Sequence, residues 1–314
     1  MDKRPLGRSG IEIAPLVFGG NVLGWTVDER RSFELLDAFF AHGLNAIDTA
    51  DAYSAWVEGH EGGESETIIG NWLARSGKRN QAVIITKVGA PLGPDRKGLS
   101  AKRIVEAAED SLRRLRVEAI DVYLSHFPDP ETPIDETLRG YEKLLSDGKV
   151  KAIGCSNYDA AQLREALGTA ASAGLPRYEV VQPEYNLYDR ASFEGELQQL
   201  CIEEGLGVIT YFSLASGFLT GKYRSEGDLS KSVRGRRVAK YLDERGFRIL
   251  AALDAVAERH GAHPAEVALA WLIGRDGVTA PIASATSLEQ LESLVRATRL
   301  SLTPEDVETL TKAG

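Results

Sequence analysis

The chain has 314 residues and a formal net charge of −9, because 46 Asp and Glu outnumber 37 Lys and Arg. Hydrophobic residues make up 43% and charged residues 26%, which is typical of a folded globular protein and excludes a disordered chain. The acidic balance argues against nucleic acid as a partner, since phosphate binding needs a basic face. The sequence also lacks a run of about 18 apolar residues, so we expect no membrane span.

The cysteines and the first residues of the sequence indicate in which cellular compartment the protein is found. Cys155 and Cys201 form no CxxC pair or disulfide framework, and residues 1–10 lack the apolar core of a secretory leader. We therefore expect a cytoplasmic protein. Cys155 has no His beside it in sequence, so we expect a small buried side chain there rather than a nucleophile.

Short apolar runs rich in Val and Ile alternate along the chain with longer segments of helical period. Most of these runs are apolar at consecutive positions, which is typical of parallel strands buried on both faces. The predicted strands are residues 16–18, 46–48, 83–86, 120–124, 151–154, 180–182, 208–211 and 278–282.

The segments between these runs predict helices, because their apolar residues recur three and four positions apart. Ser100 and Asp159 stand at N-cap positions, Pro133 fits a first turn, and Ser192 is expected to open a helix. The predicted helices are residues 30–41, 101–115, 133–147, 160–171, 192–202, 247–260, 264–273, 287–298 and 303–312.

Strand–helix alternation repeated eight times predicts a (β/α)8 TIM barrel, which takes roughly 250 residues plus insertions. We expect one domain over residues 1–314, with a small hairpin at 4–13 that could plug the bottom of the barrel and extra helices near the C-terminus. Residues 213–245 form a long irregular segment, which is typical of a functional or mobile loop. A doubly wound sheet is the alternative, but residues 18–24 do not match its GxGxxG turn.

Polar side chains follow three successive predicted strands. Asp48 ends the second run, Lys87 the third and His126 the fourth, and Tyr53 lies on the loop after Asp48. Because neighbouring strands lie about 4.8 Å apart and a barrel carries its chemistry at their carboxyl ends, we expect the four side chains to meet at one mouth. Each residue alone would suggest a cap or a packing role, but a Lys and a His buried after apolar runs need partners.

These four residue types together have one coherent chemistry. Tyrosine has a pKa of about 10 and is a poor acid at neutral pH, and a nearby Lys ammonium is expected to lower that pKa. An Asp paired with the Lys would keep it charged and aimed, and a neutral His could donate a hydrogen bond to a carbonyl. The set therefore predicts proton delivery to a carbonyl, and it needs a cofactor as the source of hydride.

A metal site is the competing interpretation, because barrel hydrolases gather several His and carboxylates around an ion. The five histidines are His42, His60, His126, His260 and His263, and they form no His-x-His pair at a strand end. We therefore expect no metal ion.

Seven motifs extend this pattern over nearly the whole chain. They are residues 45–53 (NAIDTADAY), 63–70 (GESETIIG), 85–87 (ITK), 121–126 (DVYLSH), 153–157 (IGCSN), 182–186 (QPEYN) and 214–223 (LASGFLTGKY). At these motifs the sequence resembles the aldo-keto reductase family, and in particular its bacterial branch related to the potassium-channel beta subunits.

The resemblance implies a TIM barrel that binds NADPH in an extended form without a Rossmann domain. It implies that Tyr53 is the general acid, that Asp48 and Lys87 tune it, and that His126 orients the substrate carbonyl. The mouth would be lined by aromatic residues together with Tyr53 and His126, which indicates a partly apolar or sugar-stacking pocket. The expected aromatic residues of this mouth are Trp25, Trp56 and Phe127.

The resemblance also implies a cofactor-binding set. Ser156, Asn157 and Gln182 would hold the nicotinamide carboxamide, and Tyr211 would stack on its ring. The full set is Gly20, Asn21, Asp48, Ser156, Asn157, Gln182, Tyr211, Phe212, Ser213, Leu214, Ala215, Ser216, Lys222, Arg234, Ser284, Thr286 and Gln290.

A few positions depart from the family pattern. Ser284 stands where the family often has Gly, residues 293–294 are Ser-Leu where it often has Glu-Asn, and Gln290 stands where other branches place Arg. Lys222 and Arg234 remain to meet the phosphates, so we expect NADP(H), with NAD(H) possible.

The sequence therefore predicts NADPH-dependent reduction of an aldehyde or ketone to an alcohol, with a small-molecule carbonyl as the partner. Two alternatives remain open: a sugar dehydrogenase that works in the oxidative direction, and a cofactor-sensing binding protein with weak turnover. The sequence does not indicate an oligomeric state.

Overall fold

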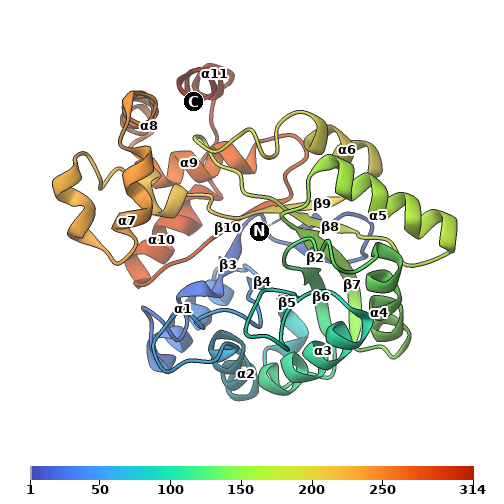
Figure 1. The fold of residues 1–314 in the computed structure, drawn as a ribbon. Coiled ribbons are helices and arrows are strands. Elements are labelled where there is room, and N and C mark those ends of the chain that lie inside the picture. The colour runs from blue at the N-terminus through green and yellow to red at the C-terminus, as the bar shows by residue number, and fades with distance from the viewer. Residues whose placement is uncertain (1) are drawn as a thin grey trace.

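The computed structural model describes residues 2–314 and contains a closed barrel of parallel strands with helices around it (Figure 1). The barrel strands are β3 Val17–Gly19, β4 Ala46–Asp48, β5 Val83–Val88, β6 Ile120–Ser125, β7 Val150–Ser156, β8 Val180–Gln182, β9 Gly207–Thr210 and β10 Ala280–Ala283. They pair in chain order, and β10 closes the barrel by pairing with both β9 and β3. These are the eight predicted strands, so the (β/α)8 fold is confirmed.

The helices that follow the strands pack outside the barrel. The longer ones are α1 Glu29–Ala41, α2 Glu64–Ser76, α3 Ala101–Leu115, α4 Ile134–Ser146, α5 Ala160–Ala173, α6 Glu196–Glu204, α8 Glu244–His260, α9 Pro264–Ile273, α10 Leu288–Ala297 and α11 Pro304–Ala313. Local capping explains several starts: the Ser100 side chain accepts a hydrogen bond from the Arg103 backbone N–H, and Asp159 forms a capping box with Gln162.

The N-terminal hairpin, β1 Arg4–Pro5 with β2 Glu12–Ile13, closes the bottom of the barrel. Leu6 and Ile13 are fully buried in one cluster with the inward-facing side chains of the barrel strands. The Arg4 guanidinium donates to the carbonyl of Thr279, just before β10, and so ties the hairpin to the amino-terminal end of the strands. The opposite end, where the strands finish, is left for a site.

Two predicted helix starts are wrong by three or four residues. Helix α6 begins at Glu196, because Gly195 has a φ of 97° and breaks the helical path, while the Ser192 hydroxyl donates to the carbonyl of Glu184. Helix α8 begins at Glu244, where the Asp243 side chain caps it by accepting from the Gly246 N–H.

Helix α2 was not predicted at all, although its residues were noted as a motif. It buries Ile69, Trp72 and Leu73, but no side chain caps its start, which follows Gly63 with a φ of 89°. Without an N-cap residue the sequence carries no start signal for this helix.

The long segment after β9 is built from short helical turns rather than being wholly irregular. They are η3 Ala215–Thr220, η4 Glu226–Lys231, α7 Gly235–Val238 and η5 Ala239–Tyr241. Two further short turns lie outside this segment: η1 Gly20–Val22 and η2 Arg79–Gln81. Within residues 2–314, the structure contains no helix with both the length and the apolar character that crossing a bilayer requires.

Candidate active site

A cavity of about 990 Å³ opens where the barrel strands end. Its wall includes the last residues of several strands or those just beyond them, so the cavity lies at the carboxyl end of the barrel. Examples are Gly19, Asp48, His126, Ser156, Gln182, Tyr211 and Ala283. This is the end at which barrel enzymes place their chemistry.

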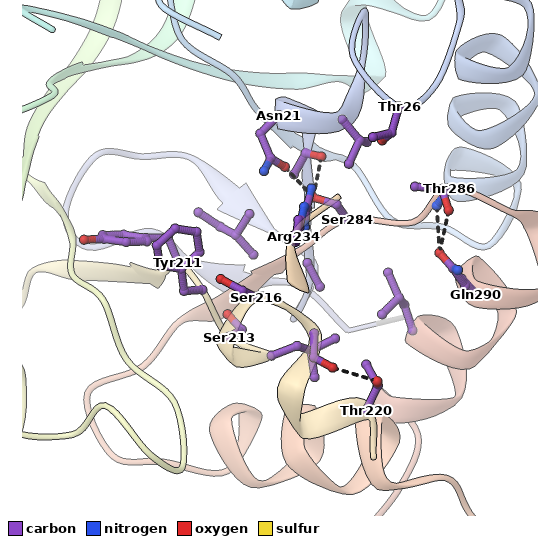
Figure 2. Close-up of a pocket in the computed structure, with 18 of the residues that line it drawn as sticks. Asn21, Thr26, Tyr211, Ser213, Ser216, Thr220, Arg234, Ser284, Thr286 and Gln290 are labelled. Atoms are coloured by element: carbon purple, nitrogen blue, oxygen red, sulfur yellow. Dashed lines mark hydrogen bonds between the residues drawn. The ribbon is translucent and has the colours of Figure 1, made fainter. Parts of the chain in front are cut away.

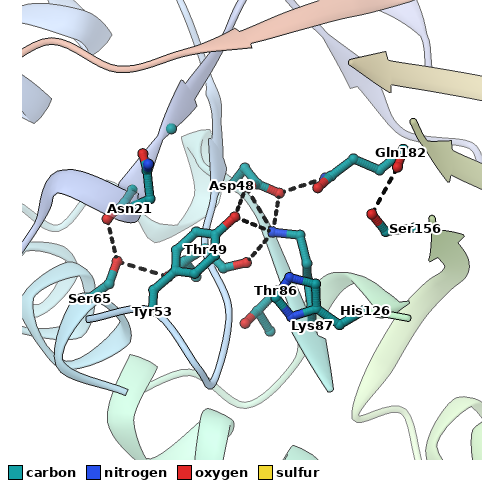
Figure 3. A network of polar contacts seen from close by, with 12 residues as sticks. Asn21, Asp48, Thr49, Tyr53, Ser65, Thr86, Lys87, His126, Ser156 and Gln182 are labelled. Carbon is teal, nitrogen blue, oxygen red and sulfur yellow. Dashed lines mark hydrogen bonds and ion pairs between the residues drawn. The ribbon is translucent and has the colours of Figure 1, made fainter. Parts of the chain in front are cut away.

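Lys87 is the centre of a tight cluster at the bottom of this cavity (Figure 3). Its Nζ lies 2.8 Å from Asp48 Oδ1 and 2.8 Å from Oδ2, and it donates to the Thr49 carbonyl at 2.7 Å and to Tyr53 Oη at 2.9 Å. Tyr53 Oη in turn donates to Asp48 Oδ2 at 3.0 Å. The expected convergence of Asp48, Lys87 and Tyr53 is therefore present in the structure.

The electrostatics of this cluster differ in one respect from the expectation. Burial, followed by the charge of Asp48, raises the pKa of Tyr53 well above its usual value, whereas the sequence analysis expected Lys87 to lower it. Burial removes the water that would stabilise a phenolate, and Oη points its proton at a carboxylate, so that ionisation would also bring two negative charges together. Tyr53 therefore keeps its proton, as an acid must before it donates.

Burial also lowers the pKa of Lys87, and the charge of Asp48 opposes that shift. The two residues are 0% and 1% exposed, so their mutual attraction is poorly screened by water. This pairing holds a charged ammonium within hydrogen-bond distance of the phenol oxygen.

His126 lies beside the cluster on the other side of the cavity floor. Its ring centroid is 6.1 Å from that of Tyr53, and it stacks on Phe127 at 4.7 Å. Burial, with a smaller contribution from Lys87, lowers the pKa of His126 well below its usual value, so the imidazole is neutral near pH 7. Its buried Nδ1 has no hydrogen-bond partner in the described chain.

Behind the cluster is a second set of buried charges that sequence reasoning did not assign a role. We call Asp51, Glu66, Arg103 and Arg114 the ion-pair layer. Arg103 pairs with Asp51 at 3.3 Å and Arg114 with Glu66 at 2.7 Å, and Thr86, next to Lys87, donates to Glu66 at 2.5 Å. Burial, followed by the charge of Glu66, raises the pKa of Asp51 to about 7. The sequence feature that could have indicated this layer is the spacing of the two arginines, which lie three turns apart on the same face of α3.

The expected nicotinamide-binding residues form one connected group. Ser156 Oγ donates to the Gln182 carbonyl at 2.8 Å, and Gln182 Nε2 donates to Asp48 Oδ1 at 2.8 Å. Tyr211 Oη donates to Asn157 Oδ1 at 2.6 Å, while Asn157 Nδ2 donates to the carbonyl of His126 at 2.8 Å. The structure thus brings all four residues together beside Asp48.

Cations also line the cavity, among them Arg234, which is labelled in Figure 2. Lys222 and Arg234 line it as expected, and so do Arg237 and Arg296, which sequence reasoning missed. The buried Nη2 of Arg234 has no partner in residues 2–314, and its guanidinium lies 5.1 Å from the Trp25 ring centre. Arg296 instead pairs with Glu266 at 2.7 Å.

Most of the remaining expected residues also line the cavity. Ser284 Oγ donates to Asn21 Oδ1 at 2.7 Å, and Gln290 Oε1 accepts from the Thr286 backbone N–H at 2.8 Å. The other expected lining residues are Phe212, Ser213, Leu214 and Ser216. Gly20 and Ala215 lie behind the wall: Ala215 is fully buried, and Gly19 lines the cavity in place of Gly20.

Aromatic side chains surround the approach to Tyr53. Trp56 lies 6.1 Å from the Tyr53 ring and 5.5 Å from Trp25, and Trp56 and Phe127 are 49% and 43% exposed. Exposed aromatic groups gathered at a cavity mark a binding surface. Among residues 2–314, no three or more His, Cys, Asp or Glu side chains are grouped so as to hold a metal ion.

Comparison with known proteins agrees with this geometry. The sequence model described as "Aldo/keto reductase family" matches residues 15–314. A probable voltage-gated potassium channel subunit beta of Arabidopsis thaliana is 35% identical, over 95% of this chain and 91% of its own length. The uncharacterized oxidoreductase YrpG of Bacillus subtilis is 34% identical, over 97% of this chain and 93% of its own length. Protein tas of Escherichia coli is 31% identical, over 98% of this chain and 95% of its own length.

The resemblance to the branch that contains the potassium-channel beta subunits is therefore confirmed. Proteins of the matched family are oxidoreductases that act on carbonyl compounds and generally bind nicotinamide cofactors. The match over residues 15–314 shows that the chain belongs to the aldo/keto reductase family.

Proposed function

We propose that the chain reduces an aldehyde or ketone to an alcohol with NADPH, and that Tyr53 delivers the proton. The observation that carries the proposal is the hydrogen bond between the buried Lys87 ammonium and Tyr53 Oη at the floor of the cavity. A protonated phenol bonded to a fixed cation can give up its proton when a carbonyl oxygen becomes negative, because the cation stabilises the phenolate left behind.

The other side chains of the site have supporting roles in this proposal. Asp48 holds Lys87 in place through both carboxylate oxygens. The neutral imidazole of His126 can donate a hydrogen bond to the substrate carbonyl and so hold it near Tyr53. The aromatic mouth excludes water and accepts the apolar part of the substrate.

The residues present fit a phosphorylated nicotinamide dinucleotide. When bound, the nicotinamide supplies the hydride that no side chain can supply. The unpartnered Nη2 of Arg234 is a donor without an acceptor inside the cavity wall, which suits an anionic group. Lys222, Arg234 and Arg237 also form no ion pair with a carboxylate within residues 2–314, so their charges are free both for the pyrophosphate that NADH and NADPH share and for the additional phosphate of NADPH.

Tyr53→Phe tests the proposed acid, because it removes only the hydroxyl. We expect the variant to bind NADPH as the wild type does and to lose at least about 100-fold in kcat. The assay follows NADPH oxidation with a panel of aldehydes and ketones, and it repeats the panel with NADH. Tyr188→Phe is the matched control, since its hydroxyl bonds Asp243 outside the cavity. Unchanged turnover in Tyr53→Phe would refute the role of Tyr53.

A cofactor-binding protein with weak turnover is the second candidate, favoured by the channel subunit names of some relatives. It predicts tight NADPH binding with slow turnover on every carbonyl tested. The sugar dehydrogenase alternative predicts faster reaction with NADP⁺ and aldoses than with NADPH and aldehydes. The same panel, run in both directions, separates the three outcomes.

A further inference from the structure

A buried hydroxyl stands next in sequence to each of three site residues. Neighbouring side chains of a strand point to opposite faces, so these hydroxyls face outward, toward the helices, while the site residues face the inside of the barrel. The pairs, at the ends of β4, β5 and β6 in turn, are Thr49 with Asp48, Thr86 with Lys87, and Ser125 with His126. We call the hydroxyls of Thr49, Thr86 and Ser125 the outer hydroxyls, and all three residues are 0% exposed.

The layer that these hydroxyls face is built mainly from apolar and aromatic side chains. Ile47, Ile84 and Tyr123, on the outer faces of the same strands, belong to the large core cluster that includes the buried sides of the helices. Ile85 and Val122 belong instead to the cluster inside the barrel. A hydroxyl in such a layer costs free energy unless it is hydrogen-bonded, so its place beside each site residue needs a reason.

Thr86 has a charged partner. Its Oγ1 donates to Glu66 Oε1, on α2, at 2.5 Å, and Arg114, on α3, donates to the other carboxylate oxygen at 2.7 Å. Glu66 is itself 0% exposed. A hydrogen bond to a carboxylate is short and strong, and this one joins the main chain beside Lys87 to two helices of the outer ring.

The other two outer hydroxyls have neutral partners. Thr49 Oγ1 donates to Ser65 Oγ, on α2, at 2.9 Å, and Ser65 donates in turn to a main-chain carbonyl of η1 at 2.8 Å (Figure 3). Ser125 Oγ lies 2.9 Å from the hydroxyls of both Tyr141, on α4, and Tyr178, just before β8. Each of the three strand ends is therefore hydrogen-bonded through a side chain to residues beyond its own strand.

We propose that the outer hydroxyls are positioning groups, which fix the strand ends from outside and so hold Asp48, Lys87 and His126 at their places in the site. Apolar contacts are non-directional and leave a strand end free to shift, whereas a hydrogen bond fixes both a distance and an angle. Groups that act on a substrate need placement to within about 0.5 Å. The proposal rests on the proposed function, because its readout is the rate of hydride transfer.

Thr86→Val is the sharpest test, because it removes the hydroxyl and keeps the shape of the side chain. We expect the rate of NADPH oxidation in a single turnover to fall about 3- to 30-fold, since a misplacement of about 1 Å can cost 100-fold, while the dissociation constant of NADPH stays unchanged. Tm should fall by about 2–5 °C, because Glu66 loses a donor. Thr86→Ser keeps the hydroxyl and should restore most of the rate.

Thr137→Val is the matched control. Thr137 is also buried, in α4, and its hydroxyl donates to the Leu99 carbonyl at 3.1 Å, away from the strands. We expect this variant to lower Tm as well and to leave the single-turnover rate unchanged. Ser125→Ala and Thr49→Val should lose rate as Thr86→Val does. Wild-type rates in all three outer-hydroxyl variants, or an equal loss in Thr137→Val, would overturn the proposal.

A variant pair tests whether Thr86 acts through Lys87. In the Lys87→Met background no ammonium remains to be positioned, so adding Thr86→Val should not slow the residual single-turnover rate further. A loss as large as in the wild-type background would show that Thr86 acts in another way and would overturn its assignment as a positioning residue.

The proposed function and this inference fail in different ways. If the wild type neither binds NADPH nor reduces any carbonyl, both fall together. If the wild type is an active reductase and the variants of the outer hydroxyls turn over as it does, only the inference about positioning is wrong.

Discussion

Replacing Lys87 by Met would remove the cation at the centre of the site while keeping a side chain of similar length. Lys87 and Asp48 are 0% and 1% exposed, so the variant leaves a carboxylate in the interior with Gln182 and Tyr53 as hydrogen-bond donors. Removing one partner of a buried ion pair costs about 3–5 kcal/mol. For a chain of this size we expect Tm to fall by roughly 5–8 °C.

The same substitution should abolish most of the turnover. Tyr53 Oη would lose the hydrogen bond from Nζ at 2.9 Å and the positive charge that stabilises its phenolate. Loss of one preorganised charged donor lowers kcat by about 100- to 1,000-fold. The assay is the loss of NADPH absorbance with the best aldehyde of the panel, measured at a temperature at which the variant is folded.

The double variant Lys87→Met with Asp48→Asn separates the two effects. It removes both charges, so we expect it to regain most of the lost stability, because no unpaired charge is left buried. Turnover should stay low, because the cation beside Tyr53 is still missing. A single variant as stable and as active as the wild type, or a double variant no more stable than the single one, would refute this account.

Three further predictions concern other parts of the molecule. The raised pKa of Asp51, about 7 when folded against about 3.9 unfolded, means that the folded state holds the proton between those values, so the free energy of unfolding falls as pH rises through them. The stability of Asp51→Asn relative to the wild type, measured by denaturant unfolding, should therefore increase from about pH 5 to pH 8, by at most about 1.4 kcal/mol per pH unit. If the two proteins differ in free energy of unfolding by the same amount at about pH 5 and at about pH 8, the raised pKa is contradicted. Arg234→Ala should weaken NADPH binding about tenfold or more and NADH binding less, with exposed Arg236→Ala as the control, and equal losses for both nucleotides would count against a contact with the additional phosphate of NADPH. Gly154→Ala should destabilise the barrel by about 1–3 kcal/mol, because its Cβ would lie 2.1 Å from the Val180 carbonyl oxygen. In Gly168→Ala, in α5, the added Cβ would contact no neighbouring atom, so this variant should be more stable than the wild type by about 0.5–1 kcal/mol.

The strands and the cluster of Asp48, Tyr53 and Lys87 were predictable because both depend on local pattern. A polar residue that ends a buried parallel strand lies at the carboxyl end of the barrel. Pairs such as Asp48 with Ile85 in the β4–β5 register bring successive strand ends together there. Asp48 ends β4, Lys87 is the last residue but one of β5 and His126 follows β6, so their convergence needed only the fold. The single-domain boundary 1–314, the cytoplasmic location and the assigned roles of the site residues stay predictions.

The features that were missed depend on tertiary contacts. Helix α2 has no cap to announce it, and Arg237 reaches the cavity only because α7 folds back over it. The side-chain amide of Asn157 was expected to face a ligand, and no sequence pattern shows that it bonds Tyr211 across the end of the barrel. The direction of the pKa shift of Tyr53 was misjudged for the same reason, since it depends on the burial of the side chain and on the hydroxyl's hydrogen bond to Asp48.

Each cation of the site and of the ion-pair layer has a carboxylate partner, and this bears on how a buried lysine could act in the proposed reaction. Asp48 balances Lys87, and in the layer two carboxylates balance two guanidinium groups. Asp48 opposes the loss of charge that burial favours in Lys87, and the field of the ammonium acts on the nearest oxygen that can change charge, which is Tyr53 Oη. Burial and Asp48 keep the phenol protonated at rest, and in the proposed reaction Lys87 would stabilise the phenolate once the proton leaves. Under this proposal the acid is available without being ionised beforehand, which a lone lysine or a lone aspartate beside the tyrosine would not achieve.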